Sequence, residues 1–181
     1  MPIMLDIGHL DCDGCPASHL RNTDRIRHVE ALRSEALSAL GADPRWIVLC
    51  ESVPANRFVY DKDSDYANSG LRFNLRNELV PGQDDDVLFR YLDDRRIWIV
   101  DAALCPLHEL GEEWRDRRHA ATLCLERHTR SYLDSHPSAP LVTILPRNCG
   151  FRKRQLPRVQ ARVVAEFRFS HLDGLKELLE G

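Results

Sequence analysis

The chain has 181 residues, of which 43% are hydrophobic and 29% are charged, and it carries a formal net charge of -3 at pH 7. This composition is that of a globular protein, most simply of one domain, and the acidic balance argues against a protein that binds polyanions over its whole surface. The chain shows no apolar run near the roughly 18 residues of a membrane span and no signal-peptide pattern at its N-terminus, so we expect a cytoplasmic protein without membrane contact.

The N-terminal segment, residues 1–23, reads as a loop that contains cysteine. Cys12 and Cys15 form a CxxC motif around Gly14. Such a knuckle turns tightly on its glycine and can direct two sulfurs at one ion. The chain has six cysteines in all, and in a reducing compartment these indicate metal binding, catalysis or simple burial rather than a disulfide framework.

The first predicted helix follows this loop. Asn22 or Thr23 is a typical N-cap, the apolar residues recur at helical spacing to about Leu40, and Gly41 is a typical stop. We expect this helix to pack on a sheet.

The segment Trp46–Cys50 is a short apolar run of the kind that forms a buried strand. It leads into a polar turn with Pro54 and then into two rings, Phe58 and Tyr60. Rings behind the end of a strand can form a pocket wall, because they stack on a flat ligand, or they can close the hydrophobic core.

Two short helices, predicted over residues 71–80 and 87–95, precede the segment around which we expect the fold to be organised. Residues Ile97–Val100 are a β-branched and aromatic run typical of a central parallel strand. Asp101 and Cys105 follow, just past the carboxyl edge of this strand, where open α/β sheets bind their ligands.

The last third of the chain continues the alternation of helix and strand. Periodicity predicts a helix over 112–135, a strand over 141–145, a strand over 161–169 with the alternation of a sheet edge, and a final helix over 171–180. The loop between these two strands is rich in cations, which suit phosphate contacts but also occur as a solvated run. These cations are Arg147, Arg152, Lys153, Arg154 and Arg158.

Four strands that alternate with helices predict an α/β three-layer sandwich with a central four-stranded parallel sheet. Right-handed crossovers place the loops that follow the strands on one edge of the sheet. Those loops are expected to begin at Glu51, Asp101, Arg147 and Ser170.

Five segments near the strand ends carry a resemblance to a known family. They are ESVPANRFVYD, SGLRFNLRNEL, IVDAALCPL, LVTILPRN and FSHLDGLKEL. With the CxxC motif, their order resembles the uracil-DNA glycosylase superfamily, and most closely its iron-sulfur branch. That branch carries an N-terminal CxxC, a Gly-Glu-x-Pro-Gly-like turn, a Lys-Cys-Pro-like segment, a Cys on the next helix and a His-Pro motif.

The resemblance implies a single uracil-DNA glycosylase-like domain over residues 1–181 that removes uracil or another deaminated base from DNA. It implies a [4Fe-4S] cluster, with zinc as the alternative for a four-cysteine site. The implied metal ligands are Cys12, Cys15, Cys105 and Cys124.

The same resemblance assigns roles around the base. The implied catalytic residues are Asp101, His171 and Glu51. The implied base-binding residues are Pro54, Phe58 and Tyr60. The DNA contacts expected from the cationic loop are Arg147, Arg152, Lys153 and Arg154. Simple structural roles compete with three of these: Asp101 as a turn cap, Glu51 as a surface carboxylate and His171 as a helix cap.

Three positions depart from the family motifs. Cys50 and Ala55 stand where the family has glycine, and Leu172 stands where it has proline. Because glycine lets the backbone approach a ligand closely, these changes narrow or reshape a base pocket. Two other functions therefore stay open: a non-catalytic protein of this fold that binds nucleic acid or a partner, and a hydrolase of small nucleotide-like ligands.

Overall fold

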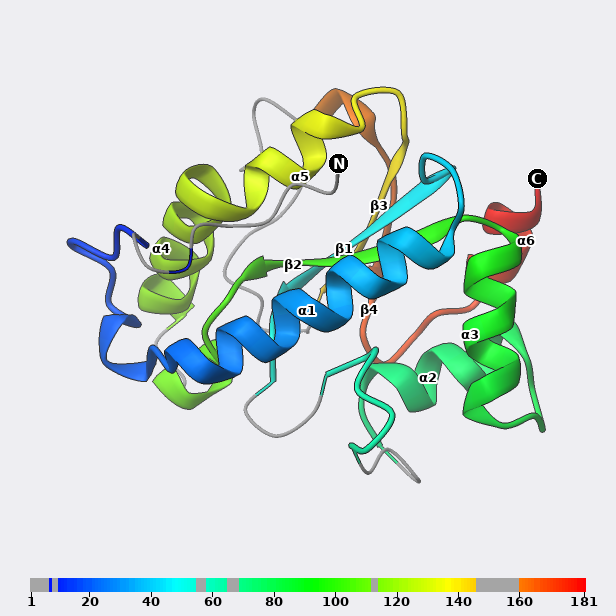
Figure 1. The fold of residues 1–181 in the computed structure, drawn as a ribbon, viewed down its shortest axis with the longest axis horizontal. Coiled ribbons are helices and arrows are strands. Elements are labelled where there is room, and N and C mark those ends of the chain that lie inside the picture. Colours follow the sequence, from blue (N-terminus) through cyan, green and yellow to red (C-terminus); the bar gives the residue numbers. More distant parts are fainter. Residues whose placement is uncertain (1–6, 8–9, 55–57, 65–68, 112–113, 146–159) are drawn as a thin grey trace.

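The computed structural model describes residues 7, 10–54, 58–64, 69–111, 114–145 and 160–181. At its centre is a four-stranded sheet, all parallel, in the order β2-β1-β3-β4 (Figure 1). The strands are β1 (Trp46–Ser52), β2 (Ile97–Ala103), β3 (Leu141–Leu145) and β4 (Val163–Arg168). The predicted parallel sheet is confirmed, and β4 is an edge strand as its alternating sequence indicated.

Helices lie on both sides of this sheet. The α-helices are α1 (Thr23–Ala39), α2 (Leu71–Leu79), α3 (Asp85–Asp94), α4 (Trp114–Cys124), α5 (Arg130–Ser135) and α6 (Leu175–Glu180). Short 3-10 turns occupy Ser18–Leu20, Leu107–Leu110 and Gln160–Arg162. In Figure 1, α4 lies at the left of the molecule, α5 at the top near its middle, and α2, α3 and α6 toward the right.

Two apolar clusters, one on each face of the sheet, hold these layers together. Because side chains alternate along a strand, Leu49 and Trp98 pack with residues of α4 and α5. Val48 and Ile99 point the other way and pack with residues of α2, α3 and α6. All seven residues of β2 are buried, which is the pattern of a strand covered on both faces. The α/β three-layer architecture is therefore confirmed.

The ends of α1 follow the sequence prediction. The side chain of Asn22 accepts a hydrogen bond from the backbone N–H of Arg25 at 3.0 Å, which satisfies an otherwise free donor of the first turn. Gly41 follows the helix with a φ of +63°, a left-handed conformation that glycine adopts without strain. Asn22 is thus the N-cap, and Gly41 ends the helix.

Two predicted helices differ from the structure. The final helix begins at Leu175 rather than His171, because Gly174 takes a φ of 82° and His171 forms a bridge with Arg168. The helix predicted over 112–135 is interrupted by a π-helical segment at Leu125–Thr129. Segments of this kind insert one residue into the helical repeat and are frequent at functional sites.

Glu51 and Asp101 lie inside strands, so the prediction that loops begin at these residues is wrong. Parallel pairing continues past the apolar runs, with Cys50 opposite Asp101 and Ser52 opposite Ala103. The two carboxylates are 4% and 3% exposed. The simpler roles of a surface carboxylate and a turn cap are therefore wrong as well.

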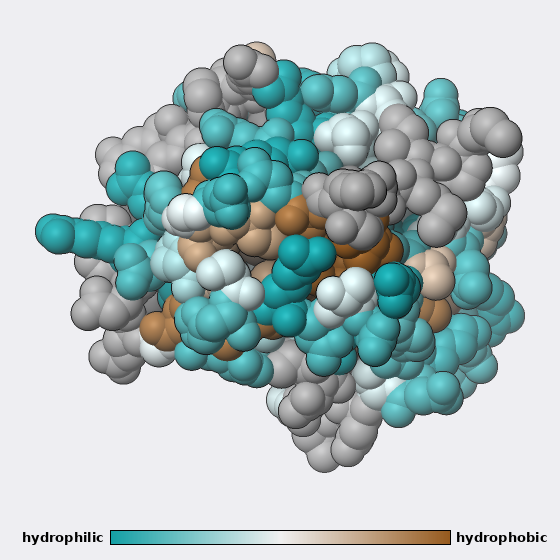
Figure 2. Space-filling model, turned by 60° about the vertical axis from the view of Figure 1, so that its left-hand side comes forward, coloured by the Kyte–Doolittle hydropathy of each residue, from teal (hydrophilic) through white to brown (hydrophobic). Residues whose placement is uncertain are grey.

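One face of the molecule gathers apolar residues. Figure 2 turns the left-hand side of Figure 1 toward the viewer and shows apolar side chains at the centre of this face within a polar rim. In the part of the chain that the structure describes, no helix is both long and apolar enough to span a membrane.

Candidate functional site

A cavity of about 320 Å³ opens at the carboxyl end of the sheet. Strands β1, β2 and β3 all contribute to its walls, through Glu51, Asp101 and Ile144 among others. The sheet order places β1 between β2 and β3, so the chain leaves β1 in one direction and later crosses to its other side. Open α/β sheets bind ligands at this switch point, in pockets of about 300–1,000 Å³.

Glu51 enters this cavity paired with a cation from another element. Arg117 of α4 places its Nη2 2.6 Å from Glu51 Oε2, and the side chains are 12% and 4% exposed. Arg117 also lines the cavity. The cavity wall thus carries an acceptor and a cationic donor side by side.

Asp101 enters the cavity backed by a buried polar network. Arg33 of α1 donates from Nη2 to Asp101 Oδ2 at 3.3 Å and from Nη1 to a Glu30 carboxylate oxygen. The hydroxyl of Tyr132 donates to the other oxygen of Glu30. The indole N–H of Trp98 donates to the backbone oxygen of Arg33 at 3.3 Å. We call Glu30, Arg33 and Tyr132 the buried network.

The environment of Asp101 changes its acidity. Burial raises the pKa of Asp101 to about 6, against the opposing attraction of Arg33, and Glu30 adds a smaller repulsion that also raises it. A carboxylate with a pKa in this range is ionised near neutral pH and can still accept a proton during a reaction.

The two predicted rings have different positions. Phe58 lines the cavity and is 1% exposed. Tyr60 packs edge-on against it, with ring centroids 5.7 Å apart, and its hydroxyl accepts a hydrogen bond from the backbone N–H of Ile99 at 2.7 Å. Tyr60 is absent from the described cavity wall. Phe58 is therefore positioned to contact a ligand, whereas Tyr60 completes the edge of β2.

Of the other predicted site residues, one lines the cavity and the others do not belong to its described wall. Pro54 lines the cavity, and its carbonyl oxygen accepts a hydrogen bond from Arg25 of α1. His171 is exposed and does not belong to the described lining of the cavity. The predicted DNA contacts, Arg147, Arg152, Lys153 and Arg154, lie outside the described residues.

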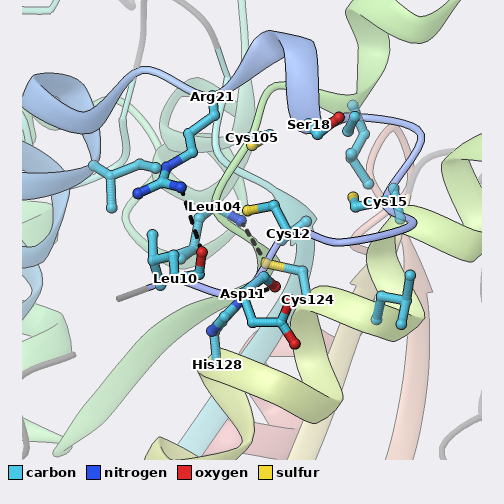
Figure 3. Close-up of a pocket in the computed structure, with 16 residues that line it drawn as sticks. Leu10, Asp11, Cys12, Cys15, Ser18, Arg21, Leu104, Cys105, Cys124 and His128 are labelled. Carbon is cyan, nitrogen blue, oxygen red and sulfur yellow. Dashed lines mark hydrogen bonds between the residues drawn. The ribbon is translucent and has the colours of Figure 1, made fainter. Parts of the chain in front are cut away.

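Four cysteines from three segments converge at a second place. Cys12 and Cys15 lie in the N-terminal loop, Cys105 follows β2, and Cys124 ends α4; all of them line one cavity of about 20 Å³ (Figure 3). The backbone N–H of Leu104 donates to the sulfur of Cys124 at 3.3 Å. The five cysteines that the structure describes are all free.

The thiols are close enough to affect one another. Burial, with a smaller contribution from the neighbouring cysteines, raises the pKa of Cys105 to about 11 and that of Cys124 to about 12. Burial also raises the pKa of Cys15. Buried thiols that repel one another's charge are stable as thiolates only when a cation compensates them.

Contacts from the π-helical segment and from Arg21 hold the N-terminal loop beside these cysteines. Arg127 donates to the carbonyl oxygen of Asp13 at 2.8 Å, and His128 Nε2 lies 2.9 Å from the carbonyl oxygen of Asp11. Arg21 donates to the carbonyl oxygens of Leu10 and Ile7, both at 3.3 Å. These contacts position Cys12 and Cys15 opposite the cysteine that ends α4.

The chemistry of these donors fits a thiolate-bound metal group, since zinc and iron-sulfur clusters both take four cysteine ligands. Among the described residues, no group of three or more His, Cys, Asp or Glu side chains is arranged to hold a single metal ion. The fit therefore rests on the identity and convergence of the donors.

Sequence reasoning missed three residues that shape the larger cavity. Arg117 and His108 line it, and Arg33 donates a hydrogen bond to the carboxylate of Asp101. Arg117 lies in the charged stretch RDRRH, where its neighbours Arg118 and His119 are exposed, so no local pattern distinguishes it. Arg33 offered one signal, because a charged residue on the apolar face of a helix needs a buried partner.

Comparison with known proteins finds no matching family model, no matching curated protein and no matching solved structure. The resemblance to the uracil-DNA glycosylase superfamily thus stays a prediction.

Proposed function

We propose that this protein hydrolyses the N-glycosidic bond of a deaminated, carbonyl-bearing base in DNA. The observation that carries the proposal is the convergence of Glu51, Asp101, Phe58 and Pro54 in one cavity at the switch point of the sheet. These are four of the residues that the motif resemblance implies. Glu51, Pro54 and Phe58 come from one segment at and just after the end of β1, and Asp101 comes from β2.

Asp101 acts as the general base of the hydrolysis, the group that accepts a proton from water. A water molecule attacks the sugar carbon, the bond to the base breaks, and its electron pair leaves with the base. Asp101 orients the water in its ionised form and takes the proton that the water loses. Its pKa of about 6 suits this role, because a general base acts best when its pKa lies near the working pH.

Arg117 and Glu51 recognise the edge of the base. A guanidinium donates to a carbonyl oxygen, and a carboxylate accepts from a ring N–H, so the pair matches the adjoining C=O and N–H of uracil, hypoxanthine or xanthine. As the base leaves, negative charge develops on its oxygen and strengthens the bond from Arg117. Adenine, which has an amino group in place of the carbonyl, offers no such acceptor.

Phe58 provides the apolar wall on which the base rests. Enzymes that act on a base in DNA take it out of the stack and hold it between rings and polar groups. The ring of Phe58 is fixed edge-on by Tyr60 and lies 5.7 Å from the guanidinium carbon of Arg33. A fixed ring needs no reorganisation when the base arrives.

The four-cysteine site completes the proposal. Cys12, Cys15, Cys105 and Cys124 would hold an iron-sulfur cluster, with zinc as the alternative, and the bound group would supply structure to the loops rather than chemistry. The cationic residues Arg147, Arg152, Lys153 and Arg154 would contact the DNA phosphates. A cytoplasmic location belongs to the same proposal, because a reducing compartment keeps such cysteines free.

The test uses anaerobically purified protein and labelled oligonucleotides that carry uracil, hypoxanthine, xanthine or adenine, single-stranded and paired. Abasic sites are cleaved with alkali and the fragments are separated by size. Breaks at the carbonyl-bearing bases and none at adenine are expected. Salt-sensitive binding without breaks would favour the non-catalytic function, and release of base only from free nucleosides would favour a small-molecule hydrolase.

A further inference from the structure

We propose that Arg33 is a positioning residue, which holds Asp101 at the cavity and, together with Glu30, controls the proton on its carboxylate. For catalysis this inference rests on the proposed function. The effect of the buried network on the titration of Asp101 can be measured without any enzymatic activity.

The geometry gives Arg33 few alternatives. Its side chain is 1% exposed, and its guanidinium carbon lies 5.7 Å from the ring centroid of Phe58 and 5.5 Å from that of Tyr132. It bonds Glu30 on one side and Asp101 on the other. One buried cation therefore contacts both the ring and the carboxylate that the proposed reaction uses.

Negative charges outnumber positive charges in this cluster. Glu30 and Asp101 are two buried carboxylates, and in the described part of the chain they share a single guanidinium, that of Arg33. A buried negative charge without a partner is costly, so one proton on the pair relieves the excess.

The bonding shows where that proton goes. Glu30 accepts from Arg33 and from the Tyr132 hydroxyl, one donor at each oxygen. Among the described residues, Asp101 accepts a bond only from Arg33, at 3.3 Å. Asp101 is the carboxylate with the weaker support and the one that opens on the cavity. The exchangeable proton is therefore at the reactive end of the network.

Other charged and titratable groups face this region from each neighbouring element. Strand β1 brings Cys50, opposite Asp101 in the sheet, and Glu51 at the cavity wall. Arg117 and His108 face the cavity from α4 and from the turn after β2, and Tyr60 lies beside the buried network. Arg33 and Glu30 are the charges that act on the pKa of Asp101, in opposite directions.

Because Arg33 and Glu30 shift the pKa of Asp101 in opposite directions, substitutions of these two residues should also shift it in opposite directions. The titration of Asp101 is followed by carbon-13 NMR of aspartate-labelled protein, with its signal assigned by its loss in Asp101→Asn. Glu30→Gln removes the repulsion and keeps the shape of the side chain, so the midpoint falls below that of the wild type. Arg33→Met removes the attraction, so the midpoint rises above it.

Glu35→Gln is the matched control, because Glu35 is an exposed carboxylate on the same helix; this variant leaves the midpoint where it is. A wild-type midpoint near the ordinary value of 3.8, or no shift in Glu30→Gln, would overturn the inference. Should Arg33→Met fail to fold, the Glu30→Gln result alone decides.

A second measurement links the network to activity. If base excision occurs, the acid limb of its pH profile moves down in Glu30→Gln, in step with the NMR midpoint. An NMR shift in a protein that excises no base would contradict the proposed function and leave this inference standing. If the enzyme is active but the acid limb of its pH–activity profile does not follow the NMR midpoint of Asp101, the inference is overturned and the proposed function stands.

Discussion

Arg117 and Glu51 are 66 positions apart in the sequence, and their side chains form an ion pair of 2.6 Å inside the larger cavity. The motif resemblance points to Glu51, but nothing in the sequence around Arg117 identifies it as the partner of Glu51. Together they give the cavity wall a donor and an acceptor, and they connect α4 to the end of β1.

Breaking this pair destabilises the protein. Because each substitution removes the 2.6 Å ion pair from a buried charge, Glu51→Gln and Arg117→Met are each expected to lower the free energy of unfolding by about 3 kcal/mol. The double variant loses less than the sum of the two, because no lone charge is left. Urea denaturation measures all three, and Arg118→Gln, an exposed arginine on the same helix, changes stability by less than about 0.5 kcal/mol. Additive single effects would show that the two side chains do not interact.

The two adjoining rings separate ligand contact from structure. Tyr60→Phe leaves the N–H of Ile99 without its acceptor, so it costs about 1–3 kcal/mol of stability, while base excision by the folded enzyme is unchanged. Phe58→Leu keeps an apolar side chain but removes the flat surface, so KM for the oligonucleotide rises about tenfold or more. Thermal unfolding and steady-state kinetics on both variants check this. Equal loss of activity in both variants would contradict the assignment.

The sheet could be predicted from the sequence because its signals are local. The apolar runs of β1, β2 and β3 are too short for helices and too apolar for loops, and the alternation in β4 indicates an edge. The N-cap Asn22 and the stop at Gly41 are equally local. Each of these features depends on neighbours within a few residues.

The polar interior could not be predicted, because it depends on partners that are remote in sequence. Asp101 and Glu51 are buried in their strands, and Arg33 and Arg117 compensate their charge from two different helices. The role of Tyr60 depends in the same way on an N–H at the edge of β2. Sequence patterns identified the carboxylates through motif resemblance, and the folded structure supplies the cations that make their burial stable.

The pH dependence of stability reports the state of Asp101. Its pKa is raised from 3.8 to about 6 on folding, so the folded protein binds this proton more tightly than the unfolded chain. The resulting stabilisation is complete below about pH 4 and is lost as the pH rises through about 6. The loss amounts to roughly 3 kcal/mol.

Urea denaturation of the wild type and of Asp101→Asn between about pH 4 and pH 7 isolates this contribution, because the other titrating groups are common to both proteins. The stability of the wild type relative to the variant should fall with rising pH. A difference that stays constant over this range would show that Asp101 has an ordinary acidity in the folded protein.

The four-cysteine site makes a prediction about metal content. Cys124→Ser replaces one of the proposed ligands, so the anaerobically purified variant should lose most of its iron and sulfide. Cys50→Ser is the matched control, because Cys50 is a buried cysteine outside the four. Metal analysis of both proteins is the measurement. Zinc without sulfide would identify the alternative metal, and equal metal content in wild type and Cys124→Ser would contradict the site.

The proposed base excision is tested by measuring the release of free base from a hypoxanthine-containing or uracil-containing oligonucleotide. Wild type, Asp101→Asn and His171→Ala are compared above pH 6 by chromatography of the released base. We expect release by the wild type and a loss of at least about 100-fold in Asp101→Asn. We expect near-normal release by His171→Ala, since His171 is exposed and outside the described cavity wall. Release that survives in Asp101→Asn and disappears in His171→Ala would contradict this expectation.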